Sequence, residues 1–303
     1  MKDYLNEIND RFPVRRKTSE KSAFFDYVSS ELGCGRVRKD IVDKNDNIII
    51  GNVEKAKVVF TAHYDTPAAS LVPNFMVPAN KLFGTLINIC YPIGIALISL
   101  ILGFGFGGLL SFDYSGSLAL YLIIYFTAFY CLTRLVSNKH NKNDNTSGVS
   151  TVMSLAAKYN DDRVAFILFD NEEKGLLGSK AYSKKYKSMM KDKLLINLDC
   201  VGNGDQFVFI AKEAAENTVG YKILREVFSS DKEGFTIHHI PFKKSLGNSD
   251  HKNFLCSVGV MAASRGRVLK LITGRIHTAK DTVADANNIT FLSEKLGSFI
   301  ERL

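Results

Sequence analysis

The sequence predicts an α/β protein: a three-layer α/β/α sandwich around a mostly parallel mixed sheet, with an inserted two-helix transmembrane hairpin. Short runs rich in β-branched and aromatic residues alternate with longer segments of helical periodicity, as in a sheet covered by helices. Between the two parts of the chain that show this alternation, residues 82–133 carry a single charged side chain, Asp113.

The segment Thr18 to Leu32 places apolar residues at helical spacing and is followed by Gly33, a typical helix end. By the same patterns we expect further helices over residues 147–159, 179–189, 219–228 and 289–302. The expected strands are residues 48–50, 58–60, 164–169, 194–198, 207–210 and 258–261. Several of these strands are apolar throughout, which indicates burial on both faces of the sheet.

The apolar block reads as two membrane spans joined by a turn. Leu82 to Leu110 has no charged residue and is long enough, as a helix, to cross a hydrocarbon core of about 30 Å. Residues 111–117 form the expected turn, and Leu118 to Val136 is the second span. The alternative is a helical hairpin buried in a soluble core, and two long uncharged stretches argue against it. We therefore expect a discontinuous domain of residues 1–80 and 138–303, with residues 81–137 as the inserted hairpin.

The charges beside the two spans predict the orientation of the hairpin. The connecting turn has no Lys or Arg, whereas Lys81 precedes the first span, Arg134 lies near the end of the second, and Lys139 and Lys142 follow it. The positive-inside rule then places the turn outside and the larger domain in the cytoplasm. Met1 to Pro13 lacks the apolar core of a signal peptide, which agrees with this topology. The expected location is the cell membrane, with two spans and a cytoplasmic domain.

Residues 103–108 match the GxGxxG pattern of dinucleotide-binding sites. They neither follow a strand nor open a helix in a βαβ unit, so we reject a dinucleotide site. Glycines at this spacing instead allow two membrane helices to approach closely.

The net charge of +8 raises the question of nucleic-acid binding. The basic residues are dispersed and no nucleic-acid-binding motif accompanies them, so we expect no nucleic-acid partner. Contact with anionic lipid headgroups fits the charge better. The five cysteines include no CxxC pair, which favours a reducing compartment over a disulfide framework.

Acidic and imidazole side chains stand where the apolar strands end. His63, the pair Glu172-Glu173 and Asp199 each follow a predicted strand. Functional residues gather at the carboxyl ends of parallel strands, so these side chains are expected to lie together. Asp65 could accept the second imidazole proton of His63 or simply stiffen the turn.

The adjacent carboxylates of Glu172 and Glu173 repel each other unless a cation lies between or beside them. One could bind a metal ion while the other accepts a proton from water, although a solvated loop would also explain the pair. The remaining candidates have ordinary alternatives too. Asp144 stands before a helix, where an N-cap is common, while Asp199 and His277 could be turn residues.

Taken in order, these motifs resemble the aminopeptidase Y-like family of di-zinc exopeptidases, relatives of bacterial leucyl aminopeptidase, glutamate carboxypeptidase and glutaminyl cyclase. Outside the hairpin the resemblance runs from about Thr18 to the C-terminus. It rests on the stretches Thr-Ala-His63-Tyr-Asp65-Thr, Asn-Asp144-Asn-Thr-Ser-Gly, Glu172-Glu173-Lys-Gly-Leu-Leu-Gly-Ser, Asn-Leu-Asp199-Cys-Val-Gly, Ser249-Asp250-His251-Lys-Asn-Phe and Ile-His277-Thr-Ala-Lys-Asp281-Thr. The chain departs from the family in its hairpin and in Lys142-Asn143, which replace small residues before Asp144.

The resemblance implies a role for each of these residues. Asp144 would bridge two zinc ions, with His63 and Asp199 completing one site and Glu173 and His277 the other. Glu172 would be the general base, Asp65 would orient His63, and residues 249–251 would support the pocket wall.

The expected function is therefore a membrane-anchored zinc aminopeptidase acting on peptides with a free N-terminus. A catalytically inactive receptor or scaffold with a peptidase fold remains an alternative, as does a relative of the glutaminyl cyclases or carboxypeptidases. The expected partners are peptide substrates and the lipid bilayer. A homo-oligomer formed through the hairpin is a further hypothesis.

Overall fold

Parallel strands buried on both faces form the centre of the structure. The computed structural model describes residues 2–71, 75–229, 234–245, 247–267 and 270–303. Within them ten strands form one sheet, and its core is four parallel strands in the order β7 (Val164–Phe169), β3 (Val58–His63), β8 (Leu194–Leu198) and β11 (Ser257–Gly266). Strand β3, which precedes the hairpin, thus lies between two strands that follow it.

The strands at the margins of the sheet are mostly antiparallel. β2 (Asn45–Ile50) pairs with β7, and β1 (Val37–Val42) pairs with β2. On the other side, β11 pairs with β9 (Gln206–Ala211) and β12 (Lys270–Gly274), and β12 pairs with β5 (Phe75–Met76). Only β10 (Thr236–Pro241) runs parallel to its partner, β9. A separate two-stranded ladder joins β4 (Ala68–Ala69) to β6 (Val136–Ser137).

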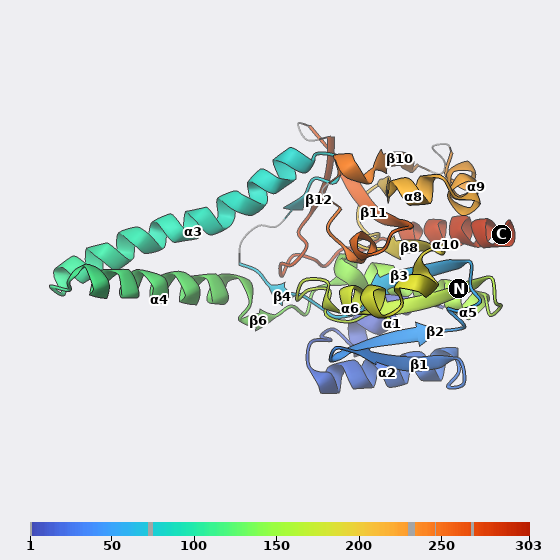
Figure 1. Cartoon of the computed structure of the whole chain (residues 1–303), viewed down its shortest axis with the longest axis horizontal. Helices are drawn as coiled ribbons and strands as arrows, with labels where there is room; N and C mark the ends of the chain where they lie inside the picture. Colours follow the sequence, from blue (N-terminus) through green and yellow to red (C-terminus); the bar gives the residue numbers. More distant parts are fainter. Residues whose placement is uncertain (1, 72–74, 230–233, 246, 268–269) are drawn as a thin grey trace.

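Helices cover both faces of the sheet, which confirms the predicted sandwich (Figure 1). Alternate strand residues point to opposite faces, so Phe60 and Phe166 join one apolar cluster while Val59 and Ile167 join the other. The first cluster packs against α1 (Tyr4–Arg11), α2 (Thr18–Leu32), α5 (Gly148–Lys158), α8 (Glu213–Glu216), α9 (Val219–Val227) and α10 (Ala286–Glu301). The second packs against α6 (Leu177–Lys185) and α7 (Lys187–Met190).

The predicted elements match the structure best where the apolar pattern is strong. Helix α2 and strands β7 and β8 have the predicted bounds. The helix expected over residues 179–189 is two helices, α6 and α7, separated at Tyr186. Helix α10 begins earlier than predicted because the Asp285 side chain caps it by accepting the N–H of Asn287. Helix α1 was not predicted, since its mostly polar sequence buries only Tyr4, Leu5 and Ile8.

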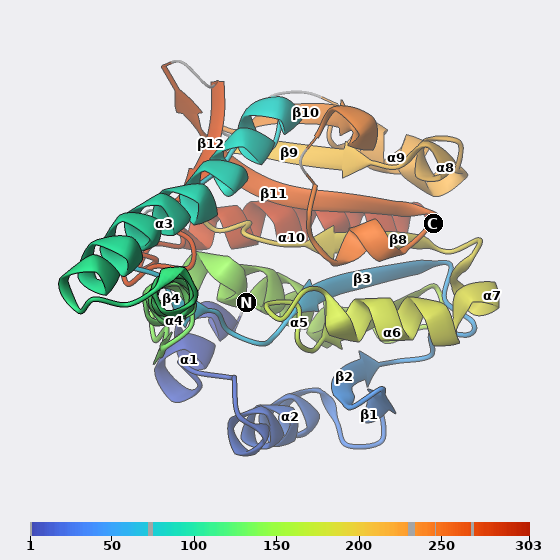
Figure 2. The same ribbon diagram turned by 60° about the vertical axis from the view of Figure 1, so that its left-hand side comes forward.

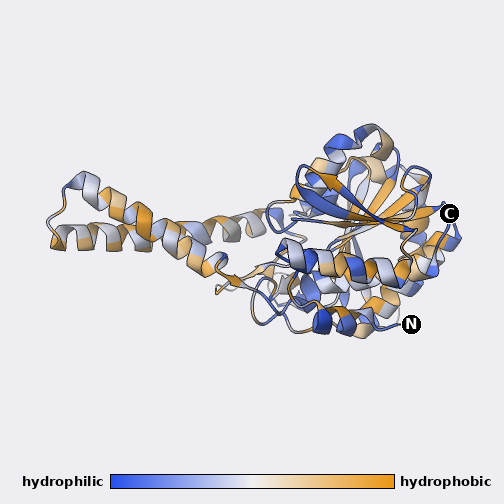
Figure 3. Cartoon of the chain, turned by 90° about the horizontal axis from the view of Figure 1, so that it is seen from below, coloured by the Kyte–Doolittle hydropathy of each residue, from blue (hydrophilic) through white to orange (hydrophobic). Residues whose placement is uncertain are grey.

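The hairpin consists of α3 (Lys81–Leu109) and α4 (Tyr114–Thr133), which project together from one side of the sandwich (Figures 1 and 2). Both are long and apolar enough to cross a membrane, and only 17% and 6% of their most apolar windows are buried. Such exposure is unlike that of a helix in a soluble core. Figure 3 shows the apolar residues spread along the whole arm. The turn is shorter than predicted because Asp113 caps α4 by accepting the N–H of Gly116.

Two glycines allow α3 and α4 to pack closely. A Cβ atom added at Gly103 would lie 2.5 Å from Cα of Tyr121, and one at Gly107 would lie 2.2 Å from Oγ of Ser117. At Gly105, two residues from each of these glycines, a Cβ would meet no described atom within 4 Å. Gly103 and Gly107, spaced four residues apart as in small-xxx-small packing, therefore let the two helices approach closely, as interpreted from the sequence.

Candidate metal centre

The parallel strands bring the predicted site residues to one edge of the sheet. His63 is the last residue of β3, and Asp199 directly follows β8. Glu172 and Glu173 lie in the loop after β7, which neighbours β3. Because β7, β3 and β8 are adjacent and parallel, their carboxyl ends meet at this edge.

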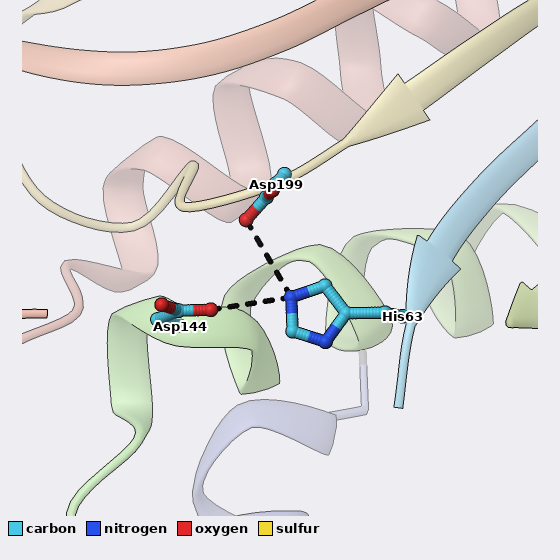
Figure 4. Close-up of side chains that lie close together, drawn as sticks. All are labelled: His63, Asp144 and Asp199. Atoms are coloured by element: carbon cyan, nitrogen blue, oxygen red, sulfur yellow. Dashed lines mark ion pairs between the residues drawn. The ribbon is translucent and has the colours of Figure 1, made fainter. Parts of the chain in front are cut away.

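Asp144 lies at the centre of the site. Its Oδ1 is 3.2 Å from Nε2 of His63, and its Oδ2 is 2.9 Å from Nε2 of His277. Oδ1 of Asp199 lies 3.7 Å from the same nitrogen of His63 (Figure 4), and Oε1 of Glu173 lies 3.4 Å from that of His277. One carboxylate thus serves two groups, which we name the first triad (His63, Asp144, Asp199) and the second triad (Asp144, Glu173, His277).

The geometry of each triad is compact. In each, one nitrogen or oxygen atom from every member lies within 4.8 Å of the others. The same holds for a third group, His63, Glu172 and Glu173, so Glu172 stands beside both triads. The structure therefore brings together all of the residues expected to bind metal and the expected general base.

The loop that carries Asp144 is held from two directions. The backbone N–H groups of Asn143 and Asp144 each donate to a carboxylate oxygen of Asp281, at 3.0 Å. The side chain of Asn145 donates to the carbonyl of Leu198 at 2.9 Å and accepts the N–H of Cys200 at 3.2 Å. The Asp144–Asn145 peptide bond is cis. These contacts fix the bridging carboxylate against the end of β8.

Asp65 has a different partner from the one expected. Its carboxylate accepts the backbone N–H groups of Glu172, at 3.0 Å, and Glu173, at 3.2 Å. Nδ1 of His63 lies 3.1 Å from the main-chain carbonyl oxygen of Asp65 but 3.6 Å from its carboxylate, beyond hydrogen-bond length. The carboxylate of Asp65 thus lies near the imidazole of His63 but takes its hydrogen bonds from the two loop amides. Asp65 faces His63 through its backbone and holds the Glu172-Glu173 loop with its side chain.

The Arg15 side chain hydrogen-bonds to chain segments that lie on both sides of the hairpin in the sequence. Its side chain is fully buried, and Nε donates to the carbonyl of Tyr64 at 2.5 Å. One Nη donates to the carbonyl of Phe12 at 2.7 Å, and the other to Oγ1 of Thr146 at 3.1 Å. Tyr64 precedes the hairpin and Thr146 follows it. A single guanidinium therefore ties together segments separated by the insertion.

The carboxyl groups of the site are crowded and buried. Burial, reinforced by neighbouring carboxylates, raises the pKa of Glu172 well above its usual range and that of Glu173 to about 8. Burial lowers the pKa of His277, but the charges of Glu173 and Asp144 outweigh it and raise the value to about 10. The raised pKa values of these carboxyl groups and of His277 have one common cause, the crowding of negative charge in a buried site.

The residues present fit divalent metal ions. Among the described residues, Oε1 of Glu173 and Oδ1 of Asp199 are buried and have no hydrogen-bond partner, which is costly unless a cation lies beside them. Imidazole nitrogen and carboxylate oxygen are a donor set that zinc accepts. Two triads that share one carboxylate are suited to two neighbouring ions.

An apolar pocket adjoins Asp199. The wall expected from residues 249–251 is formed by Ser249 and His251, whereas Asp250 is fully buried behind it. His251 packs under Gly259, where an added Cβ would lie 2.5 Å from its ring. The pocket is lined by Met76, Pro78, Asn197, Asp199, Ile210, Gly247, Asn248, Ser249, His251, Gly259, Val260 and Met261.

Comparison with known proteins identifies the family. Residues 136–293, which include most of the site, match Peptidase family M28. The chain belongs to this family. The resemblance drawn from the ordered motifs is thereby confirmed. No curated protein matches the chain.

Solved structures share the fold of this M28 peptidase at low sequence identity. The glutaminyl cyclase of Porphyromonas gingivalis is similar with a TM-score of 0.60 and 14% identity, over 99% of this chain and 96% of that one. The LapA aminopeptidase of Legionella pneumophila has a TM-score of 0.57 and 15% identity, over 98% and 69%. BSAP, a zinc aminopeptidase from Bacillus subtilis, has a TM-score of 0.50 and 18% identity, over 85% and 50%.

Two residues that organise the site of this M28 peptidase had no role assigned from the sequence. Asp281 lies four residues beyond His277 in the same motif, and this position beside a candidate ligand could have indicated its role in holding the Asp144 loop. Arg15 stands in a run of basic residues that looks like an exposed cluster, and nothing local distinguishes it. Its partners are contributed by distant parts of the chain.

Proposed function

We propose that the chain is a membrane-anchored, zinc-dependent exopeptidase, and specifically an aminopeptidase that removes N-terminal residues from peptides with a free N-terminus. The observation that carries the proposal is the placement of Asp144, whose two carboxylate oxygens each face a different histidine. Membership of a peptidase family supports hydrolysis of peptides. The fold shared with LapA and with BSAP, a zinc aminopeptidase, supports the choice of metal and of the N-terminal end.

The first and second triads would each hold one zinc ion, with Asp144 contributing an oxygen to both. When bound, such ions polarise the scissile carbonyl and lower the pKa of a nearby water. The chain itself must fix the ligands and supply the proton transfer. Asp281, Asp65 and Asn145 perform the first task through the hydrogen bonds described above.

Glu172 is the residue placed to move the proton. It accepts a proton from the attacking water as the water oxygen bonds to the scissile carbonyl carbon. When the carbon–nitrogen bond breaks, Glu172 returns that proton to the nitrogen of the leaving amine. Its position beside His63 and Glu173 lets it act on a substrate held next to both triads. The apolar pocket beside Asp199 would receive an apolar side chain of the substrate.

A substrate panel on purified, zinc-loaded full-length protein tests this function. We expect cleavage of aminoacyl amides and peptides with a free N-terminus, faster for apolar first residues, and no cleavage of the same peptides after N-acetylation. Cleavage of acetylated peptides from the C-terminal end would favour a carboxypeptidase instead. Protein that binds no zinc and cleaves nothing would identify the inactive scaffold.

Glutaminyl cyclisation is the second candidate, because the cyclase of Porphyromonas gingivalis shares the fold over 96% of its length. The panel therefore includes a peptide that begins with glutamine. Release of ammonia from that peptide, with no hydrolysis of the others, would replace the aminopeptidase proposal with the cyclase.

The exposed apolar surface of α3 and α4 supports a membrane anchor, and the charges at their ends support a cytoplasmic catalytic domain. Labelling of whole cells with an impermeant thiol reagent tests this orientation. The native exposed cysteines, Cys34 and Cys90, are first replaced by serine. We expect a cysteine at Ser115, in the first turn of α4, to be labelled and one at Ser188, on α7, to be protected until the cells are opened. The reverse pattern would place the catalytic domain outside.

A further inference from the structure

The hairpin returns to the sandwich through a small hydrogen-bonded unit. We define the hairpin root as residues 68–71 and 134–137. Strand β4 pairs with β6 across it, with Ala68 opposite Ser137, and the N–H of Leu71 donates to the carbonyl of Leu132 in the last turn of α4 at 3.0 Å. The root is therefore continuous in sequence with α4 and hydrogen-bonded to its last turn.

The root contacts both non-bridging members of the second triad. Nη1 of Arg134 donates to the main-chain carbonyl of Glu173 at 3.0 Å. The backbone N–H of Ser70 donates to the carbonyl of His277 at 2.6 Å. The segment that leads into α3 adds a third contact, because Phe75 and Met76 of β5 pair with Gly274 and Thr273 of β12, just before His277.

The first triad is held differently. His63 is the last residue of the central strand β3, paired with Phe169 of β7. The N–H of Asp199 donates to the carbonyl of Val260 in β11 at 3.0 Å. These two positions are fixed by the sheet itself. The second triad lies on loops, where the hydrogen bonds of the root replace the support of a strand.

The loop that carries Glu173 needs such support. It begins at Asn171 and ends at Leu176, which have φ angles of 53° and 62°. Leucine rarely adopts this left-handed conformation without supporting contacts, whereas asparagine adopts it more readily. The Asp65 carboxylate holds the backbone N–H groups of Glu172 and Glu173. Arg134 donates a hydrogen bond to the main-chain carbonyl of Glu173, so both the N–H and the carbonyl of that residue have partners.

We propose that the hairpin root is part of the metal site, and that Arg134 is a positioning residue that sets the affinity of the second triad for its ion. This inference rests on the proposed function, since it requires the triads to bind metal. Besides anchoring the protein, the hairpin then supports the second triad through its root. Residues that support a ligand without touching the metal typically change metal affinity by about 10- to 100-fold. Arg134 is exposed and contacts a backbone atom, so a smaller effect is expected.

Titration of the metal-free full-length protein with Zn²⁺ alone, in lipid nanodiscs, tests the proposal. In the Asp199→Ala background, where the second triad is intact, we expect Arg134→Gln to weaken zinc binding about three- to tenfold. In the His277→Ala background, where the first triad is intact, the same change should leave zinc binding unaltered. Arg134→Lys, which keeps the charge and a donor, should restore part of the affinity.

Lys139→Gln is the matched control, because it removes an exposed positive charge from the same connection without removing a hydrogen bond among the described residues. Equal binding by Arg134→Gln and wild type in the Asp199→Ala background would overturn the proposal. So would equal weakening by Lys139→Gln, or equal weakening of both triads. Wild-type protein that binds no zinc would instead refute the proposed function, and with it this inference.

Discussion

We expect the Glu172→Gln variant to hydrolyse peptides about 10³-fold more slowly than the wild type while binding zinc to the same extent, because general-base catalysis contributes about 10²- to 10⁴-fold. Glutamine preserves the shape of the side chain but cannot accept the proton from water. The loss should therefore appear in kcat, with little change in KM. Steady-state kinetics on a free-amine peptide, with metal analysis of the same sample, measures both quantities.

The matched control for this variant is Glu294→Gln, which makes the same chemical change on the exposed side of α10. It should retain full activity. A Glu172→Gln variant with normal metal content and undiminished kcat would remove Glu172 from the mechanism. A variant that loses its zinc as well as its activity would show that Glu172 holds metal rather than transferring a proton.

The Asp144→Ala variant should lose both metal ions and all measurable peptidase activity. Each oxygen of this carboxylate faces a histidine of a different triad, so one substitution leaves both triads incomplete. We expect the zinc content after dialysis to fall from about two ions per chain to near zero, since two protein ligands rarely retain zinc. Elemental analysis by mass spectrometry gives the stoichiometry.

Single-triad variants provide the comparison for Asp144→Ala. Asp199→Ala and His277→Ala each damage one triad and should each lose about one ion. An Asp144→Ala protein that retains as much zinc as these variants would show that the carboxylate does not bridge. Circular dichroism checks that the fold survives, since the backbone of the loop remains held by Asp281 and Asn145.

The sequence predicts the elements that are determined by neighbouring residues alone, such as the buried strands. The strands β7 and β8 are continuous apolar runs, so their bounds and burial follow from composition. Because parallel strands share one edge for their carboxyl ends, the meeting of His63 and Asp199 follows as well. The ordered motifs added Asp144 and His277, which no periodicity would have placed beside them.

The supporting contacts could not be predicted because they depend on how distant segments fold together. Arg15 reaches a backbone carbonyl before the hairpin and a hydroxyl after it, and neither partner has a recognisable pattern. Arg134 was interpreted only as a positive charge that sets membrane orientation, whereas its guanidinium reaches the carbonyl of Glu173. The side chain of Asp65 was assigned to the neighbouring imidazole, since its true partners lie more than a hundred residues away in the chain.

The place of β3 in the sheet has a consequence for biosynthesis. This strand emerges before the hairpin, yet both of its neighbours, β7 and β8, are made after it. The first 80 residues therefore cannot complete a core while the spans are being synthesised. If only one span crossed the bilayer, β3 and its neighbours would lie on opposite sides and the sheet could not form. If α3 and α4 cross the bilayer as proposed, both must cross before the metal centre can assemble, because a single crossing would separate β3 from β7 and β8.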